Sequence, residues 1–152
     1  ALIFLVNIAA ALGAFGFGYA QDRIGHKAAL GVTLAGWIVM TVLAAVATGA
    51  PLFWVAAVIA GLCMGSSQSA GRAMAGVFAP AAQRAEFYGL WTFATRLSAI
   101  LGPLTYGAVT WATGGNHRLA ILSTASFFVL GLVLLTPVNV QRGQRAAEGA
   151  AT

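Results

Sequence analysis

The chain has 152 residues, of which 60% are hydrophobic and only 7% are charged. A soluble domain carries about 25% charged residues, so this composition excludes a protein whose whole surface faces water. The formal net charge is +5, but the basic residues flank long apolar runs instead of forming one polar face, which argues against binding to nucleic acid.

Five apolar stretches are long enough to cross a membrane as helices, because a spanning helix needs about 20 mostly apolar residues. They cover approximately residues 1–20, 28–48, 51–76, 86–113 and 119–138. Membrane β-strands alternate over pieces of about 10 residues, so we predict an all-α membrane protein with a helical bundle over residues 1–138. The polar stretch 139–152 shows no apolar period and is predicted to be a disordered tail.

The positive charges indicate how the helices are oriented. Turns 21–27 and 77–85 and the C-terminal tail hold most of the basic residues, whereas the turn after the second helix holds none. The positive-inside rule therefore places these turns and the C-terminus in the cytoplasm, and we expect a bacterial inner (plasma) membrane. The chain begins at Ala1, inside an apolar run and without Met, so we expect that an N-terminal portion precedes it.

The first turn is charged and contains Gly25, which can adopt a positive φ and let the chain reverse tightly. Asp22 lies in this turn, and a carboxylate at this depth is costly unless it is paired. Arg72, near the end of the third helix, lies at a similar depth, so one hypothesis is an Asp22–Arg72 pair that acts as a conformational latch. The alternatives are a simple basic turn around Asp22 and an Arg72 side chain that extends to the lipid headgroups.

The fourth predicted helix carries an arginine inside the membrane. Arg96 follows Glu86 by ten residues, or roughly 15 Å at 1.5 Å per residue. Small and polar residues form one stripe with it at spacings of three and four: Thr92, Thr95, Arg96, Ala99, Pro103, Tyr106 and Thr110. Such a stripe is typical of a helix that faces a water-filled cavity or a partner helix. Three roles stay open for Arg96: binding a substrate carboxylate, pairing with a carboxylate outside this fragment, or extending to the headgroups.

Other polar residues give no catalytic pattern. Asn7 and Gln68 are predicted to form interhelical hydrogen bonds or, alternatively, to line a cavity. His26 and His117 lie in turns on opposite sides of the membrane, so they cannot share a metal or a catalytic site. Residues 65–71 lack the Gly-x-Ser-x-Gly spacing of a serine hydrolase, and the single cysteine forms no metal pattern. We therefore predict no enzyme activity, no metal and no cofactor.

Glycines are expected to bring the helices together. Lipid gives helices no hydrophobic reason to associate, so small residues must allow close backbone contact. Gly61 and Gly65 form one such face, although a direct role in substrate binding is an alternative. Gly102 and Pro103 are expected to kink the fourth helix, because proline removes a backbone donor and its ring clashes with the preceding turn.

The first turn, Gly18-x-x-x-Asp22-Arg23-x-Gly25-His26-Lys27, resembles the G-x-x-x-D-R-x-G-R-K loop signature of the major facilitator superfamily. The later chain resembles the vacuole effluxer family, which includes fungal vacuolar amino-acid exporters and bacterial relatives. The matching features are Gln68, Arg72, Pro80, Glu86-Phe87-Tyr88-Gly89-Leu90-Trp91, Gly102-Pro103, Arg118-x-x-Ile121-Leu122-Ser123 and the run from Phe127-Phe128 to Gly131. Two departures are Gly71-Arg72-Ala73, where the family often has Ser-Arg-Ser, and Arg96, where it often has lysine.

The resemblance implies the last five helices of a twelve-helix transporter. The latch that it implies comprises Asp22, Arg23, Gly25, Lys27, Arg72 and Glu86. We expect a secondary transporter of small solutes, with amino acids as the first candidate, Arg96 on an anionic group and Thr92, Thr95, Asn7 and Gln68 along the path. The expected partners are the solute, the lipid bilayer, the N-terminal half of the same protein and, if transport is proton-coupled, protons. The alternative is a non-transporting scaffold or assembly subunit that retains the fold.

Overall fold

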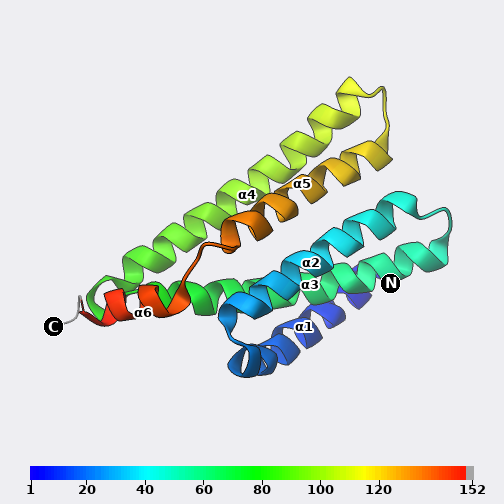
Figure 1. Cartoon of the computed structure of the whole chain (residues 1–152). Coiled ribbons are helices and arrows are strands. Elements are labelled where there is room, and N and C mark those ends of the chain that lie inside the picture. Colours follow the sequence, from blue (N-terminus) through cyan, green and yellow to red (C-terminus); the bar gives the residue numbers. More distant parts are fainter. Residues whose placement is uncertain (150–152) are drawn as a thin grey trace.

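The computed structural model describes residues 1–149 and contains helices but no strands over that part of the chain (Figure 1). The helices are α1 (Leu2–Ile24), α2 (His26–Val46), α3 (Ala50–Phe78), the short 3-10 helix η1 (Ala81–Gln83), α4 (Arg84–Ala112), α5 (His117–Leu135) and α6 (Val140–Gly149). The five long helices run back and forth and are joined by short turns. The architecture is that of an all-α membrane protein.

Among the described helices, four are long and apolar enough to cross a membrane by length and composition: α1, α2, α3 and α5. We expected five spans, and the fifth corresponds to α4. This helix has 29 residues, which exceeds the length that a span needs. Its composition is less apolar because the polar stripe around Arg96 replaces one apolar face. α4 continues as one helix through Pro103.

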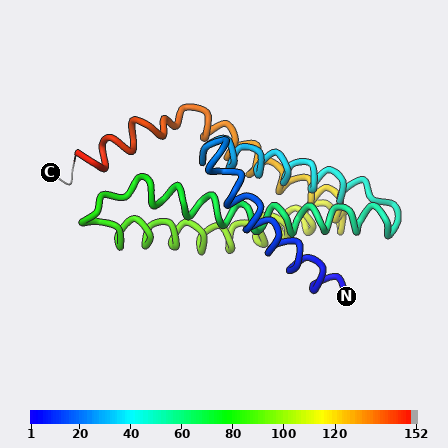
Figure 2. Tube along the Cα trace, turned by 90° about the horizontal axis from the view of Figure 1, so that it is seen from below, coloured from blue at the N-terminus to red at the C-terminus, as the bar shows by residue number. Residues whose placement is uncertain are grey.

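Glycines lie where α1 packs against α3. A Cβ added to Gly61 would lie 2.5 Å from the carbonyl oxygen of Val6, and one added to Gly65 would overlap the carbonyl oxygen of Ala10. Gly13 of α1 is equally close to the backbone of α3. Figure 2 shows α1 crossing the other long helices obliquely. The absence of side chains at these positions is therefore what allows the two backbones to touch.

The second helix joins the two sides of the bundle, because α2 packs on both α3 and α5. Its buried Thr33 hydroxyl lies 3.2 Å from the buried hydroxyl of Ser66 on α3. On the other side, the ring of Trp37 stacks on that of Phe128 in α5, with centroids 5.1 Å apart. α5 in turn contacts α4, so the order of packing is α1, α3, α2, α5 and α4.

The outer surface of the bundle is apolar. Large side chains point outward, and Phe15 and Trp111 are 83% and 88% exposed, while the buried hydrophobic residues are mostly alanines. No residue of α4 is buried. This distribution suits a protein whose surroundings are lipid and further helices instead of water.

The tail differs from our expectation of disorder, because residues 140–149 form the helix α6. Ala147 is buried, and a Cβ on Gly143 would lie 2.5 Å from the ring of Phe78 at the end of α3. The spacing of four places both small residues on one face of the helix, while Arg142 and Arg145 are exposed. We overlooked this face because its residues are small instead of large and apolar. The last residues of the predicted tail, 150–152, lie outside the described part of the chain.

Candidate solute pathway and cytoplasmic latch

Arg96 projects from α4 without a partner in the described chain. It is exposed and forms no hydrogen bond or ion pair within residues 1–149. Arg96 follows the first residue of α4 by twelve positions, or about 18 Å along the helix axis. A guanidinium at such a depth requires a partner or water, so Arg96 is available to an anionic group.

The threonines beside Arg96 present oxygen atoms that can only accept. The hydroxyl of Thr92 donates to the backbone oxygen of Tyr88 at 2.8 Å, and that of Thr95 donates to the backbone oxygen of Thr92 at 2.8 Å. Each hydroxyl hydrogen is therefore engaged, while oxygen lone pairs remain free. Thr92 and Arg96 are four residues apart, which places their side chains next to each other on the helix.

The structure does not bring Asn7 to the same place. Its Nδ2 donates to the backbone oxygen of Ile3 in the same helix, at 2.8 Å, and α1 packs mainly on α3 instead of α4. Asn7 lies 17 residues before the end of α1, or about 25 Å from that end. Gln68 is exposed on α3 and lies ten residues, or about 15 Å, before the end of that helix. Gln68 is thus at nearly the depth of Arg96, whereas Asn7 is closer to the opposite face.

The turn between α1 and α2 reverses the chain at a single residue. Gly25 has φ of 85°, a conformation that residues with a Cβ avoid. Arg23 turns back along α1, where it donates to the Tyr19 hydroxyl at 2.7 Å and lies over the same ring. Asp22 is exposed and forms no ion pair within residues 1–149.

Arg72 has a different partner from the one expected. Its guanidinium lies over the indole ring of Trp91 in α4, 5.2 Å from the ring centroid, and no ion pair joins it to Asp22 in the described chain. Trp91 also contacts α3 at Gly71, where a Cβ would lie 3.3 Å from the indole nitrogen. Glu86 is exposed in the first turn of α4, where a negative charge is favoured by the helix dipole. Asp22 and Arg72, the two residues expected to form the ion pair of the latch, are therefore not paired in this structure.

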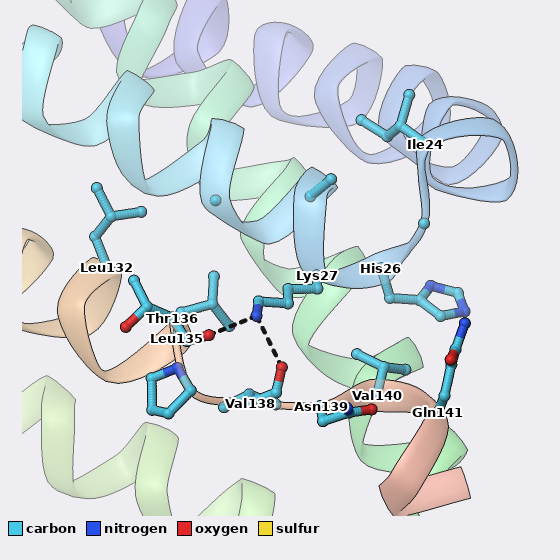
Figure 3. A pocket seen from close by; sticks show the side chains of 14 residues that line it. Ile24, His26, Lys27, Leu132, Leu135, Thr136, Val138, Asn139, Val140 and Gln141 are labelled. Atoms are coloured by element: carbon cyan, nitrogen blue, oxygen red, sulfur yellow. Dashed lines mark hydrogen bonds between the residues drawn. The ribbon is translucent and has the colours of Figure 1, made fainter.

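Lys27 ties the first turn to the end of α5. Its ammonium group donates to the backbone oxygens of Thr136 at 2.7 Å and Val138 at 2.8 Å (Figure 3). These carbonyls follow the C-terminal end of a helix, where a cation is favourable. A pocket of about 830 Å³ lies between this turn and the linker from α5 to α6. His26 and Gln141 line the pocket at its edge.

Tyr106 and His117 form a polar contact near the C-terminal end of α4. The hydroxyl of Tyr106, on the polar stripe, lies 2.9 Å from Nδ1 of His117 at the start of α5. The two rings are stacked, with centroids 6.1 Å apart. Sequence reasoning placed Tyr106 on the stripe and His117 in a turn but did not join them. The ten residues between them include the turn that joins α4 to α5, and the geometry of that turn decides the contact.

Comparisons with known proteins agree with this geometry. The sequence model of the vacuole effluxer Atg22 like family matches residues 1–148. The chain belongs to this family. Autophagy-related protein 22-1 of Aspergillus niger is 36% identical over 90 residues, which cover 59% of this chain and 14% of that protein. Autophagy-related protein 22 of Candida glabrata is 31% identical over 88 residues, or 58% of this chain and 16% of that protein. The chain therefore aligns with less than a fifth of either relative.

Solved structures of a sugar transporter have the same fold. The inward open conformation of the xylose transporter XylE from E. coli superposes with a TM-score of 0.81, at 18% identity, over 99% of this chain and 43% of that one. XylE bound to 6-bromo-6-deoxy-D-glucose is described as a proton:xylose symporter of the major facilitator superfamily. It superposes with a TM-score of 0.78, at 20% identity, over 97% of this chain and 38% of that chain. The predicted superfamily fold is confirmed, and the chain corresponds to part of it.

The kind of membrane was predicted less well. The apolar helices and the family support an integral membrane protein. We expected a bacterial inner membrane, but the relatives named above are fungal, and the description of the family refers to the vacuole. Charge distribution indicates the side on which a turn lies and carries no information about the organelle.

Proposed function

We propose that this chain is the C-terminal part of a secondary transporter that moves small amino acids by alternating access. Membership of the vacuole effluxer family and the fold shared with a superfamily transporter support a role in transport. Transporters of this kind bind solute near the middle of the membrane and rock two helical bundles about that site. The N-terminal half of the parent protein would supply the second bundle.

The observation that carries the proposal is the exposed Arg96 on the stripe of α4. Arginine only donates hydrogen bonds, and its planar fork fits a carboxylate. The hydroxyls of Thr92 and Thr95 already donate to backbone oxygens, so they are left to accept from an ammonium group. Adjacent groups that bind a carboxylate and an ammonium complement an amino-acid zwitterion. Gln68 lies at a similar depth, and we propose that it lines the same path.

The cytoplasmic latch is part of this proposal. Asp22 and Arg72 are both exposed and carry opposite charges, and their ion pair would form in the state in which the cytoplasmic side is closed. Arg72 on Trp91 then represents the open latch. Gly25 and Lys27 hold the turn that carries Asp22, and Arg23 and Glu86 add charges near it. We also propose that this turn, the turn between α3 and α4 and the C-terminus face the cytoplasm.

The test is transport by the full-length parent in proteoliposomes, measured as uptake and exchange of labelled amino acids. Arg96→Ala should lower apparent affinity by about 10- to 150-fold, the equivalent of losing a charged hydrogen bond worth about 1.5–3 kcal/mol. Arg96→Lys should lie between Arg96→Ala and the parent, because it keeps the charge and loses the fork. Arg145→Ala, which removes an exposed arginine from α6, is the matched control and should transport normally.

Two results would contradict the proposal. If the parent transports and Arg96→Ala transports equally well, Arg96 does not bind the solute. If the correctly inserted parent moves no solute of a broad panel, amino acids are the wrong class, and the scaffold alternative gains support.

A further inference from the structure

We infer that His117 and Tyr106 form a proton-binding site at the end of the polar stripe opposite the charged turn, which is the outer end in the proposed orientation. The inference rests on the proposed transport function and adds a pH-sensitive group to it. The site consists of the Tyr106 hydroxyl and the imidazole Nδ1, 2.9 Å apart. Tyr106 lies on the same face of α4 as Arg96, so the site and the proposed solute position share one stripe.

The distribution of titratable groups singles out this pair. The chain has only three acidic residues, Asp22, Glu86 and Glu148, and all three lie near the cytoplasmic ends of helices. No carboxylate of this chain can therefore take up a proton at the outer end. Imidazole is the side chain whose charge ordinarily changes between about pH 5 and 8, and the other histidine, His26, starts α2 at the cytoplasmic turn.

Water can reach the imidazole ring of His117. His117 is exposed. Tyr106 of α4 faces the His117 ring. Arg118 is the next residue of the same helix, and its guanidinium turns away from His117 and donates to the backbone oxygen of Ala47 at 3.4 Å. The turn between α2 and α3 carries no charged residue. Arg118 is thus the one fixed charge near this site in the described chain.

Protonation changes which partner of the pair donates. In the neutral pair that we infer, the hydrogen lies on Nε2, and the Tyr106 hydroxyl donates to Nδ1. A proton taken from water by Nδ1 converts the ring into an imidazolium that donates from both nitrogens. Tyr106 must then accept, so its own hydrogen is released to point toward another acceptor on the stripe. One proton is bound, one unit of positive charge is added, and no covalent bond other than N–H is formed.

The added charge favours an anionic solute group at the outer entrance of the stripe. Tyr106 follows Arg96 by ten residues of α4, or about 15 Å, and one unit charge at that distance from a carboxylate in water changes affinity by about 1.6-fold. The expected consequence is tighter binding from the outside at low pH and weaker binding at high pH. Outer acidity would in this way promote solute entry into the outward-facing state.

The test measures the outside KM of the full-length parent in proteoliposomes at about pH 5.5 and about pH 8, on either side of the usual imidazole transition. The parent should show a KM up to about 1.6-fold higher at high pH, and His117→Gln should remove this difference. His26→Gln is the matched control and should keep it, because His26 lies at the other end of the bundle. A His117→Gln profile that matches the parent, with exchange intact, would overturn the proton site while leaving the transport proposal standing.

A second measurement does not depend on transport. Nitrogen-15 NMR of the histidine rings in the parent should show His117 with its neutral-state hydrogen on Nε2 and should show protonation of Nδ1 at low pH. Tyr106→Phe, which keeps the ring and removes the hydroxyl, should abolish the preference for that tautomer. If the neutral hydrogen lies on Nδ1 in both proteins, the inferred exchange of donor roles is wrong, whatever the transport assay gives.

Discussion

Adding one methyl group at Gly65 should separate α1 from α3. The Cβ of Gly65→Ala would overlap the carbonyl oxygen of Ala10 and lie 2.7 Å from the carbonyl carbon of Ala10 and 2.8 Å from the amide nitrogen of Ala14. All three atoms belong to the backbone of α1, so no side-chain rotation can relieve the clash. The helix as a whole must move away.

The cost can be placed against a matched substitution. Overpacking a well-packed interface costs about 1–3 kcal/mol, and an immovable backbone favours the upper part of that range. Gly102→Ala introduces the same methyl group into α4, where no atom lies within 4 Å of the added Cβ. That variant should be neutral or gain up to about 1 kcal/mol from the better helix propensity of alanine.

The assay is thermal unfolding of the detergent-solubilised parent and both variants under identical conditions. A loss of about 2 kcal/mol corresponds to a Tm lower by about 4–8 °C for a cooperative unit of about 150–250 residues. Gly65→Ala should therefore melt clearly below Gly102→Ala. If the two variants melt together, the close contact between α1 and α3 is not what holds these helices, and the reasoning from the glycines fails.

Two further predictions concern the contacts of Lys27 and Arg72. Lys27→Met removes the two hydrogen bonds to Thr136 and Val138, each worth about 1.5–3 kcal/mol as a bond to a charged group. Amide hydrogen exchange over residues 136–141 should therefore accelerate in Lys27→Met, whereas Lys27→Arg should retain most of the protection. Unchanged exchange in Lys27→Met would show that the linker is held by other contacts. A double-mutant cycle between Arg72→Met and Trp91→Leu should give a coupling of about 0.5–1 kcal/mol, the range for an exposed cation–π contact; a coupling of zero would mean that Arg72 is not held by Trp91.

The latch hypothesis illustrates where reasoning from sequence reaches its limit. Helix alternation predicts that Asp22 and Arg72 lie at a similar depth, and the structure places them near the C-terminal ends of α1 and α3. Depth leaves the rotation of each helix undetermined, and in the structure Arg72 turns toward Trp91 of α4. The sequence contains Trp91 in a conspicuous aromatic block. However, Arg72 and Trp91 are nineteen positions apart on two different helices, and a contact of this kind has no local signal in the sequence.

The tail shows a limit of a different kind. Its ten-residue helix has no large apolar side chain after Val140, so no pattern in the sequence indicated a buried face. The partner of that face is the ring of Phe78 in α3, against which Gly143 packs. A glycine becomes evidence for packing only when the neighbouring surface is known.

The sequence by itself determined the properties that depend on local composition. Run length and hydropathy specify helices that suit a membrane, and the positions of Arg23, Lys27 and Arg84 predict which turns share a side. Tertiary structure alone decided which faces meet: Gly65 with Ala10, Lys27 with the end of α5, and Tyr106 with His117. The physical reason is that lipid and neighbouring helices are equally apolar, so hydrophobicity cannot choose between them, and the choice falls to close packing and hydrogen bonds between residues far apart in the chain.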